Sequence, residues 1–178
     1  MDYSFRKACA GDEGRIADIF DEARKRIAPL GIDQWQGGYP NIENAIADIE
    51  NGTGFVLTND EGVIVAYASL GLSGDKNYDT IEGKWISSGR YGVIHRVAVS
   101  DTALRKKAAS TIMLEMEKEC MRCGFEWARI DTHKGNIPMR AMVESLGYIH
   151  CGVITLLDGE AASEKRMRRS WYDSLIEF

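Results

Sequence analysis

The chain has 178 residues, of which 44% are hydrophobic and 28% are charged, and its formal net charge is -5 at pH 7. These proportions predict one globular domain over residues 1–178, and the acidic balance argues against a nucleic-acid partner. Because neither a signal peptide nor an apolar run of membrane-spanning length is evident, we expect a cytoplasmic protein with no membrane partner.

Two of the four cysteines, Cys120 and Cys123, have the C-x-x-C spacing found in zinc and redox sites. The chain has only three histidines and no second cysteine pair that would complete a tetrahedral zinc site. We therefore interpret the cysteines as reduced thiols, in keeping with a cytoplasmic chain, and expect no metal ion.

The N-terminal part of the chain predicts one strand and two helices. Residues 5–8 form a short strand, and Asp12 is placed to cap the helix that follows. Apolar residues then recur at helical spacing until Pro29 and Gly31 end the pattern, namely Ile16, Ile19, Phe20, Ala23 and Ile27. After a loop rich in glycine and aromatic residues, a second helix has a similar apolar stripe of Ile42, Ala45, Ile46 and Ile49.

The pattern then changes to strands that alternate with helices. Two β-rich runs, residues 55–57 and 63–72, are joined by a turn with Gly62 at the position that needs a positive φ. The elements expected after them are a polar loop at 73–90, strands at 93–99, 127–130, 148–157 and 163–167, and helices at 104–123 and 137–146. The apolar positions of helix 104–123 include Ile112, Leu114, Met116 and Cys120. This order predicts a mixed α/β layer fold.

The most informative segment is the strand at 93–99 together with the helix that follows it. Three consecutive cations, Arg105, Lys106 and Lys107, stand where the helix begins. Cations are unfavourable at the positive end of a helix dipole, whereas the free N–H groups there bind anions. The pattern leaves two interpretations open, a site for a phosphate group and a solvated basic turn.

This strand, turn and helix resemble motif A of the GNAT superfamily of acetyltransferases, whose fingerprint Gln/Arg-x-x-Gly-x-Gly/Ala falls on residues 105–110. Residues 131–148 are similar to its motif B, in which an asparagine (here Asn136) precedes a glycine and an aromatic residue by eleven positions. The segments 34–40, 82–85 and 157–159 resemble one bacterial branch of that superfamily. Together these motifs cover nearly the whole chain.

The resemblance implies the GNAT fold, a mixed and mostly antiparallel sheet of about six or seven strands flanked by about four helices. It also implies transfer of an acetyl group from acetyl-CoA, the co-substrate, to a primary amine of a small molecule or peptide by direct attack. The strand and Asn136 would bind pantetheine, and the turn would hold the diphosphate. The cofactor-binding residues that it implies are Val97, Ala98, Val99, Arg105, Lys106, Lys107, Ala108, Ala109, Ser110 and Asn136.

Two positions depart from the family pattern. Ala108 stands where the fingerprint has glycine, and a methyl group there would hinder the close approach of a phosphate. Val143 stands where many members carry a tyrosine that protonates the leaving thiolate. These departures favour the alternative of a catalytically impaired GNAT-like domain that serves as a CoA-binding or protein-interaction module.

His95 and Glu82 are the candidate catalytic bases. His95 lies two residues before Val97, so regular strand geometry places both side chains on one face, and the resemblance implies that a base comes from that face. The alternative for His95 is a core histidine bonded to a backbone carbonyl, and the alternative for Glu82 is a solvated loop carboxylate.

Trp35, Tyr39 and Trp85 are the candidate acceptor-binding residues, because aromatic side chains in loops suit an apolar cleft and stack on cations. The alternative is that they fill the base of the domain. The final run at 166–172 predicts an edge strand and a solvated tail, with a homodimer contact as an alternative.

Overall fold

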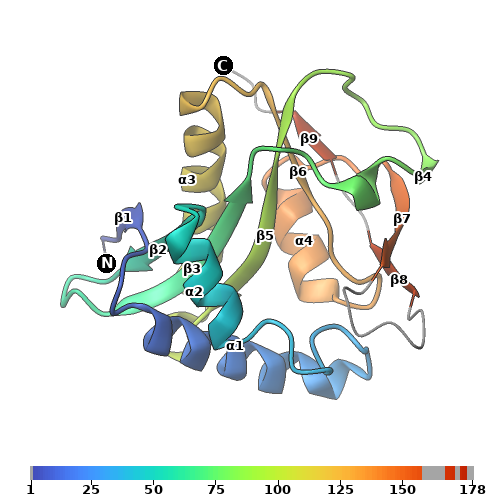
Figure 1. The fold of residues 1–178 in the computed structure, drawn as a ribbon. Coiled ribbons are helices and arrows are strands. Elements are labelled where there is room, and N and C mark those ends of the chain that lie inside the picture. The colour runs from blue at the N-terminus through green and yellow to red at the C-terminus, as the bar shows by residue number, and fades with distance from the viewer. Residues whose placement is uncertain (1, 158–166, 171–172, 176–178) are drawn as a thin grey trace.

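The computed structural model describes residues 2–157, 167–170 and 173–175, in which helices flank two β-sheets (Figure 1). The helices are α1 (Glu13–Ile27), α2 (Ile42–Glu50), α3 (Ala108–Arg122) and α4 (Ile137–Ser145). The strands are β1 (Ser4–Lys7), β2 (Gly54–Thr58), β3 (Ile64–Gly71), β4 (Ile81–Gly83), β5 (Tyr91–Val99), β6 (Trp127–Ile130), β7 (Gly152–Leu157), β8 (Met167–Ser170) and β9 (Asp173–Leu175).

The larger sheet has six strands in the order β1-β2-β3-β5-β6-β9, and the smaller sheet has three in the order β4-β7-β8. Neighbouring strands are antiparallel except for β5 and β6, which run parallel. A parallel pair needs a crossover connection, and α3 lies in the segment that joins β5 to β6. The mixed, mostly antiparallel sheet expected from the sequence is therefore confirmed.

Helices cover both faces of the larger sheet. On one face, α3 and α4 pack Ile112, Met116 and Val143 against the inner strands. On the other face, α1 and α2 pack Phe20 and Ala45 against those strands. Because helices cover both faces, nearly all residues of β2 and β3 are buried. This explains why the sequences of these two strands are nearly continuous apolar runs.

The predicted apolar stripes hold for α1 but only in part for α2. In α1 the residues at helical spacing are buried, namely Ile16, Ile19, Phe20 and Ala23. In α2, Ile42 and Ile46 are exposed, which the sequence did not predict. These two side chains face outward because the buried face of α2 includes Asp48, whose carboxylate forms an ion pair with Arg96 of β5.

The long helix begins later than predicted, at Ala108, because residues 104–107 form turns. Arg105 and Lys107 adopt left-handed backbone conformations with φ of 59° and 63°, which a continuous helix does not allow. Leu114 is exposed, contrary to the prediction, and Met113 is buried in its place. Ile112, Met116 and Cys120 are buried as expected.

Strand β5 contains a bulge at Arg96, whose φ is 54°. Ser69 pairs with His95 and Tyr67 pairs with Ala98. Between these two pairs β5 therefore has one more residue than β3. The extra residue reverses the alternation of side chains. Val97 packs against the cluster beside α3, whereas His95 lies near Tyr78 on the other side, so the predicted common face of His95 and Val97 is wrong.

Two regions of the chain differ from the elements expected for them. The segment at 73–90 is not only a polar loop, because it contains β4, which pairs with β7. The predicted strand at 148–157 begins at Gly152 and belongs to the smaller sheet. Of the predicted strand at 163–167, residues 163–166 lie outside the described residues, and β8 begins at Met167 and lies at the edge of that sheet as described.

Candidate active site

The strands β5 and β6 separate at the centre of the larger sheet. They pair only from Tyr91 with Trp127 to Ile94 with Ile130, although β5 continues to Val99. The described residues place no strand beside 95–99 on the β6 side, and we call this interruption of the sheet the notch. Because the Ser100 N–H donates to the Val65 carbonyl (2.8 Å), the alternation of an antiparallel pair directs the backbone groups of Val99 away from β3. The Val99 carbonyl there accepts a hydrogen bond from Arg26 Nη2 (2.9 Å).

Helix α3 follows β5 in the chain, and its first turn lies at the end of the notch. Thr111 N–H makes the first intrahelical bond, to Lys107 O, and no side chain caps the helix. Within the described residues, the N–H groups at 108–110 therefore have no acceptor, and they stand beside three exposed cations. Such a helix start favours a phosphate ligand over a merely solvated turn.

The methyl group of Ala108 does not obstruct this helix start. Ala108 is 1% exposed and packs in the core cluster beneath α3, so the concern that its side chain would block a phosphate is wrong. The positions that strain the backbone are Arg105 and Lys107, which have positive φ. Tyr3, the residue just before β1, supports this turn, because its hydroxyl donates to the Lys106 carbonyl (3.0 Å).

Asn136 lies on the β6 side of the notch and is mostly buried. Its Oδ1 accepts a hydrogen bond from Met139 N–H (3.3 Å) and so caps α4, and its Nδ2 donates to Gln34 Oε1 (2.9 Å). The side chain thus joins α4 to the loop at 31–40. Nearby, Thr132 is 2% exposed, and its hydroxyl has no hydrogen-bond partner among the described residues.

His95 sits between two carboxylates. Its Nε2 lies 3.5 Å from Asp75 Oδ2 and its Nδ1 lies 3.9 Å from Asp131 Oδ1. Asp131 Oδ1 also accepts a hydrogen bond from the Tyr78 hydroxyl (2.7 Å). Burial lowers the pKa of His95 below its usual value, against the opposing effect of Asp131, and so favours the neutral ring.

The neighbouring Arg96 is anchored from α2. Its Nε and Nη2 donate to the two carboxylate oxygens of Asp48 (2.9 and 2.6 Å), and its Nη1 donates to the Tyr39 hydroxyl (2.8 Å). Burial disfavours the charge, but Tyr39 and Asp48 outweigh it and raise the pKa of Arg96. The Tyr67 hydroxyl also donates to Asp48. The ion pair between Arg96 and Asp48 holds the bulged residue, Arg96, in its left-handed conformation.

The sequence did not single out Asp75, Asp131, Arg96 or Asp48. Asp131 had a usable signal, because it follows β6 just as His95 follows the paired part of the parallel strand β5. Asp48 also had a signal in the sequence, because it is an acidic residue near the apolar stripe of α2. Asp75 had none, since it belongs to an irregular loop. 

The other site residues predicted from the sequence lie in different parts of the fold. Tyr39 contacts Arg96 and so lies beside the His95 cluster, whereas Trp35 packs against the core under α1 and α2. Trp85 stacks against Tyr78 and Arg129, and its Nε1 donates to the Tyr78 carbonyl. Glu82 is exposed on β4. Trp85 and Trp35 therefore pack as parts of the fold.

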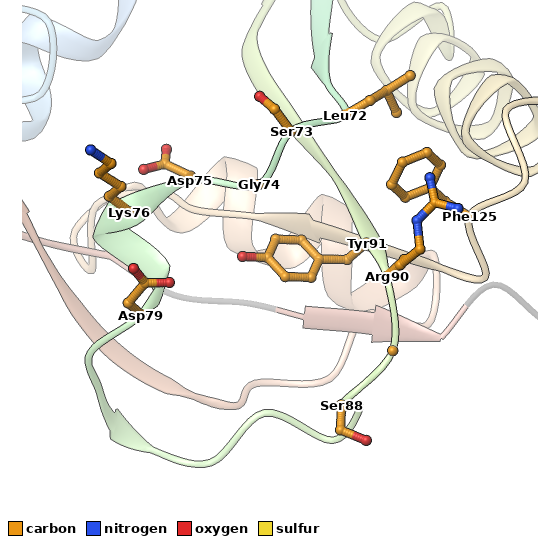
Figure 2. A pocket seen from close by; sticks show the side chains of 11 residues that line it. Leu72, Ser73, Gly74, Asp75, Lys76, Asp79, Ser88, Arg90, Tyr91 and Phe125 are labelled. Atoms are coloured by element: carbon orange, nitrogen blue, oxygen red, sulfur yellow. The ribbon is translucent and has the colours of Figure 1, made fainter.

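An open cavity of about 640 Å³ adjoins this cluster (Figure 2). The loop at 72–79 forms one wall, residues 88–91 form another, and Phe125 lies at one end. Asp75 lines the cavity and also faces His95, so the two features share a carboxylate.

The four cysteines are unpaired, and burial raises the pKa of the Cys120 thiol to about 11. Across the described residues, no group of three or more potential metal ligands comes together. In the same residues, no helix has the length and apolar character needed to cross a membrane.

The sequence matches the model of the Acetyltransferase (GNAT) family over residues 18–148, which is more than half of the chain. A search of curated proteins finds no significant match. Among solved structures, a GNAT-family acetyltransferase from Streptococcus agalactiae is 33% identical, with a TM-score of 0.83, and the match covers 99% of this chain and 96% of that one. The chain therefore belongs to the GNAT family of acetyltransferases and is an acyltransferase.

Two more distant structures share the fold. The Salmonella typhimurium protein yncA, solved with its cofactor acetyl-CoA, is 17% identical, with a TM-score of 0.68 and coverage of 100% and 96% of the two chains. A ribosomal-protein-alanine N-acetyltransferase from Brucella melitensis is 20% identical, with a TM-score of 0.66 and coverage of 97% and 99%. The GNAT fold expected from the motifs is confirmed.

Proposed function

We propose that residues 1–178 form one cytoplasmic N-acetyltransferase domain, which transfers an acetyl group from acetyl-CoA to a primary amine of a small molecule or peptide by direct attack. The observation that carries this proposal is the position of His95, held between Asp75 and Asp131 beside the notch where β5 leaves β6. A cytoplasmic setting agrees with four unpaired cysteines.

The notch fits the two polar parts of coenzyme A. The free N–H groups at the start of α3, with Arg105, Lys106 and Lys107 beside them, suit the diphosphate. Over Val97, Ala98 and Val99, β5 has no strand partner on the β6 side, and the amides of pantetheine would pair with this edge as an added strand does. The Val99 carbonyl already accepts a hydrogen bond from Arg26 Nη2 (2.9 Å), so its N–H is the group left for that pairing.

Acetyl-CoA supplies an activated acyl group, and the chain has to supply a deprotonated amine. An amine arrives as an ammonium ion at neutral pH, which Asp75 attracts. Nε2 of neutral His95 faces that carboxylate and takes the proton, directly or through water. The neutral amine attacks the thioester carbonyl, and a backbone N–H of β5 stabilises the negative charge that develops on the acyl oxygen. The C–S bond then breaks, and CoA leaves as a thiolate that takes up a proton from water or from protonated His95. Val143 is fully buried, so its side chain takes no part.

Calorimetry and a thiol-release assay test this function. We expect saturable binding of acetyl-CoA with a Kd between about 1 µM and 1 mM, and amine-dependent release of free thiol across amino acids, polyamines, aminoglycosides and peptides. Binding without turnover on any amine would support the impaired CoA-binding domain instead. The absence of saturable heat at millimolar acetyl-CoA would contradict both.

The left-handed residue that begins α3 gives a separate prediction. Lys107→Gly relieves the strain of a positive φ at an exposed helix start, so we expect the melting temperature to rise by roughly 2–4 °C, or about 1 kcal/mol. The same change removes a cation beside the proposed diphosphate site and weakens acetyl-CoA binding by about 3- to 10-fold. Thermal melting and calorimetry measure the two effects.

Lys106→Gly is the matched control, because Lys106 carries the same charge but does not have a positive φ. This control should lose a similar amount of affinity without gaining stability. A Lys107→Gly variant that melts below the Lys106→Gly variant would show that residue 107 is not left-handed in solution.

A further inference from the structure

The cavity beside His95 carries balanced charge. Its lining includes two carboxylates, Asp75 and Asp79, and two cations, Lys76 and Arg90. A polyamine requires a site with an excess of negative charge, and a phosphorylated acceptor requires an excess of positive charge. A lining with neither excess suits an acceptor that itself bears one charge of each sign.

The charges of the cavity are also separated in space. Figure 2 shows Asp75, Lys76 and Asp79 on the loop at one side of Tyr91, and Arg90 with Phe125 at the other. The Arg90 side chain is exposed and lies over the Phe125 ring, 4.4 Å from its centroid. No carboxylate in the described part of the chain forms an ion pair with Arg90, so its charge is open to a ligand.

The acidic side of the cavity is the side that would bind the reacting amine. Asp75 Oδ1 accepts hydrogen bonds from the backbone and side-chain nitrogens of Asn77 (2.8 and 2.9 Å), which fixes the carboxylate. Its Oδ2 faces His95 Nε2 at 3.5 Å. An ammonium group bound at Asp75 therefore lies beside the ring nitrogen that has to accept its proton.

We infer that the acceptor is a small amine that carries a carboxylate at the other end of a short carbon chain, as the side-chain amine of lysine does, with its ammonium group at Asp75 and its carboxylate at Arg90. This inference rests on the proposed function and adds a substrate class to it. Phe125, Tyr91 and Leu72 supply apolar lining between the two charges. A cavity of about 640 Å³ is within the usual range for a small-molecule site.

The experiment compares two pairs of amines, 6-aminohexanoate with its amide and lysine with cadaverine, on the wild-type protein and on Arg90→Gln. Because a carboxylate changes the acidity of an amine in the same molecule, the decisive quantity is the effect of the variant on each amine. We expect Arg90→Gln to lower kcat/KM for 6-aminohexanoate and lysine by about 10-fold, through KM. The values for the amide, for cadaverine and for acetyl-CoA should stay unchanged.

Two variants serve as controls. Arg90→Lys keeps the charge and should restore most of the loss, whereas Arg122→Gln removes the same charge from the far end of α3 and should change nothing. An equal effect of Arg90→Gln on all four amines, or a wild-type preference for cadaverine over lysine, would overturn the inference.

Binding of 6-aminohexanoate, measured by calorimetry with free CoA present, tests the cavity without turnover. Saturable binding that weakens in Arg90→Gln supports the inference, and no saturable binding overturns it. If no amine is acetylated while 6-aminohexanoate still binds through Arg90, the proposed function fails and the carboxylate site stands.

Discussion

Replacing His95 with glutamine should lower kcat by about 100- to 10,000-fold, the range expected for the loss of a general base. Glutamine keeps a polar group between Asp75 and Asp131, so the surrounding carboxylates are not left facing a void. The affinity for acetyl-CoA should not change, because the proposed diphosphate site lies at the start of α3. Steady-state kinetics and calorimetry on the same preparation measure both quantities.

The pH dependence of the wild-type protein identifies His95 independently. Burial lowers its pKa below the ordinary value of about 6.5. The base is active only when neutral, so kcat/KM should be independent of this group near pH 7 and should fall as the pH is lowered through that shifted pKa. The groups that face the ring and set this value are Asp75, Asp131, Asp48 and Arg96. The His95→Gln variant should lose this acidic limb.

Glu82→Gln separates the two candidate bases, because Glu82 is exposed on β4 in the smaller sheet. A large loss of kcat in Glu82→Gln, with His95→Gln close to wild type, would transfer the role to Glu82. An acidic limb that persists in His95→Gln would show that another group titrates there.

The order of the elements was readable from the sequence because each has a strong local signal. Apolar spacing in α1, the turn at Gly62 and the β-branched run of β5 all reflect two-sided burial in a layered fold. The proposed diphosphate site at the start of α3 also had a sequence signal, since its three cations are out of place for a helix N-terminus. The boundary of α3 had none, because left-handed residues such as Lys107 have no distinct sequence signature.

The details of the site were not readable because they depend on a single inserted residue. A strand with regular alternation would place His95 and Val97 together, and only pairing with β3 shows that Arg96 is extra. The roles of Asp75 and Asp131 follow from which loops meet at that point, and contacts between distant segments leave no periodic pattern in one sequence. The Ala108 departure was misread for a related reason, since the direction of its methyl group depends on where α3 begins.

The geometry of the notch depends on the ion pair between Arg96 and Asp48. A left-handed conformation at a residue other than glycine costs about 1–2 kcal/mol, so the bulge needs contacts that hold it. Both nitrogens of the Arg96 fork contact the Asp48 carboxylate, which also accepts hydrogen bonds from Tyr67 and Thr53. The bulge in turn sets the orientation of His95 and lies just beyond the point where β5 stops pairing with β6.

Asp48→Ala should therefore destabilise the protein by about 3–5 kcal/mol, because it leaves the Arg96 charge and the Tyr67 hydroxyl without their partner in the interior. For a chain of this size the melting temperature should fall by roughly 6–20 °C. At temperatures where the variant is folded, we also expect kcat to fall, since the bulge and His95 would lose their fixed position. Thermal melting and kinetics at low temperature separate the two effects.

Glu50→Ala is the matched control, since Glu50 lies on the same helix with the same charge but is exposed. Its melting temperature should stay close to that of the wild type, because exposed substitutions change stability by about 0.5 kcal/mol or less. Asp48→Asn, which keeps the size and one acceptor of the side chain, should fall between the two. A loss below about 1 kcal/mol in Asp48→Ala would show that solvent reaches this pair, because exposed ion pairs contribute no more than that. The bulge would then have to be held by the strand contacts of β3 alone.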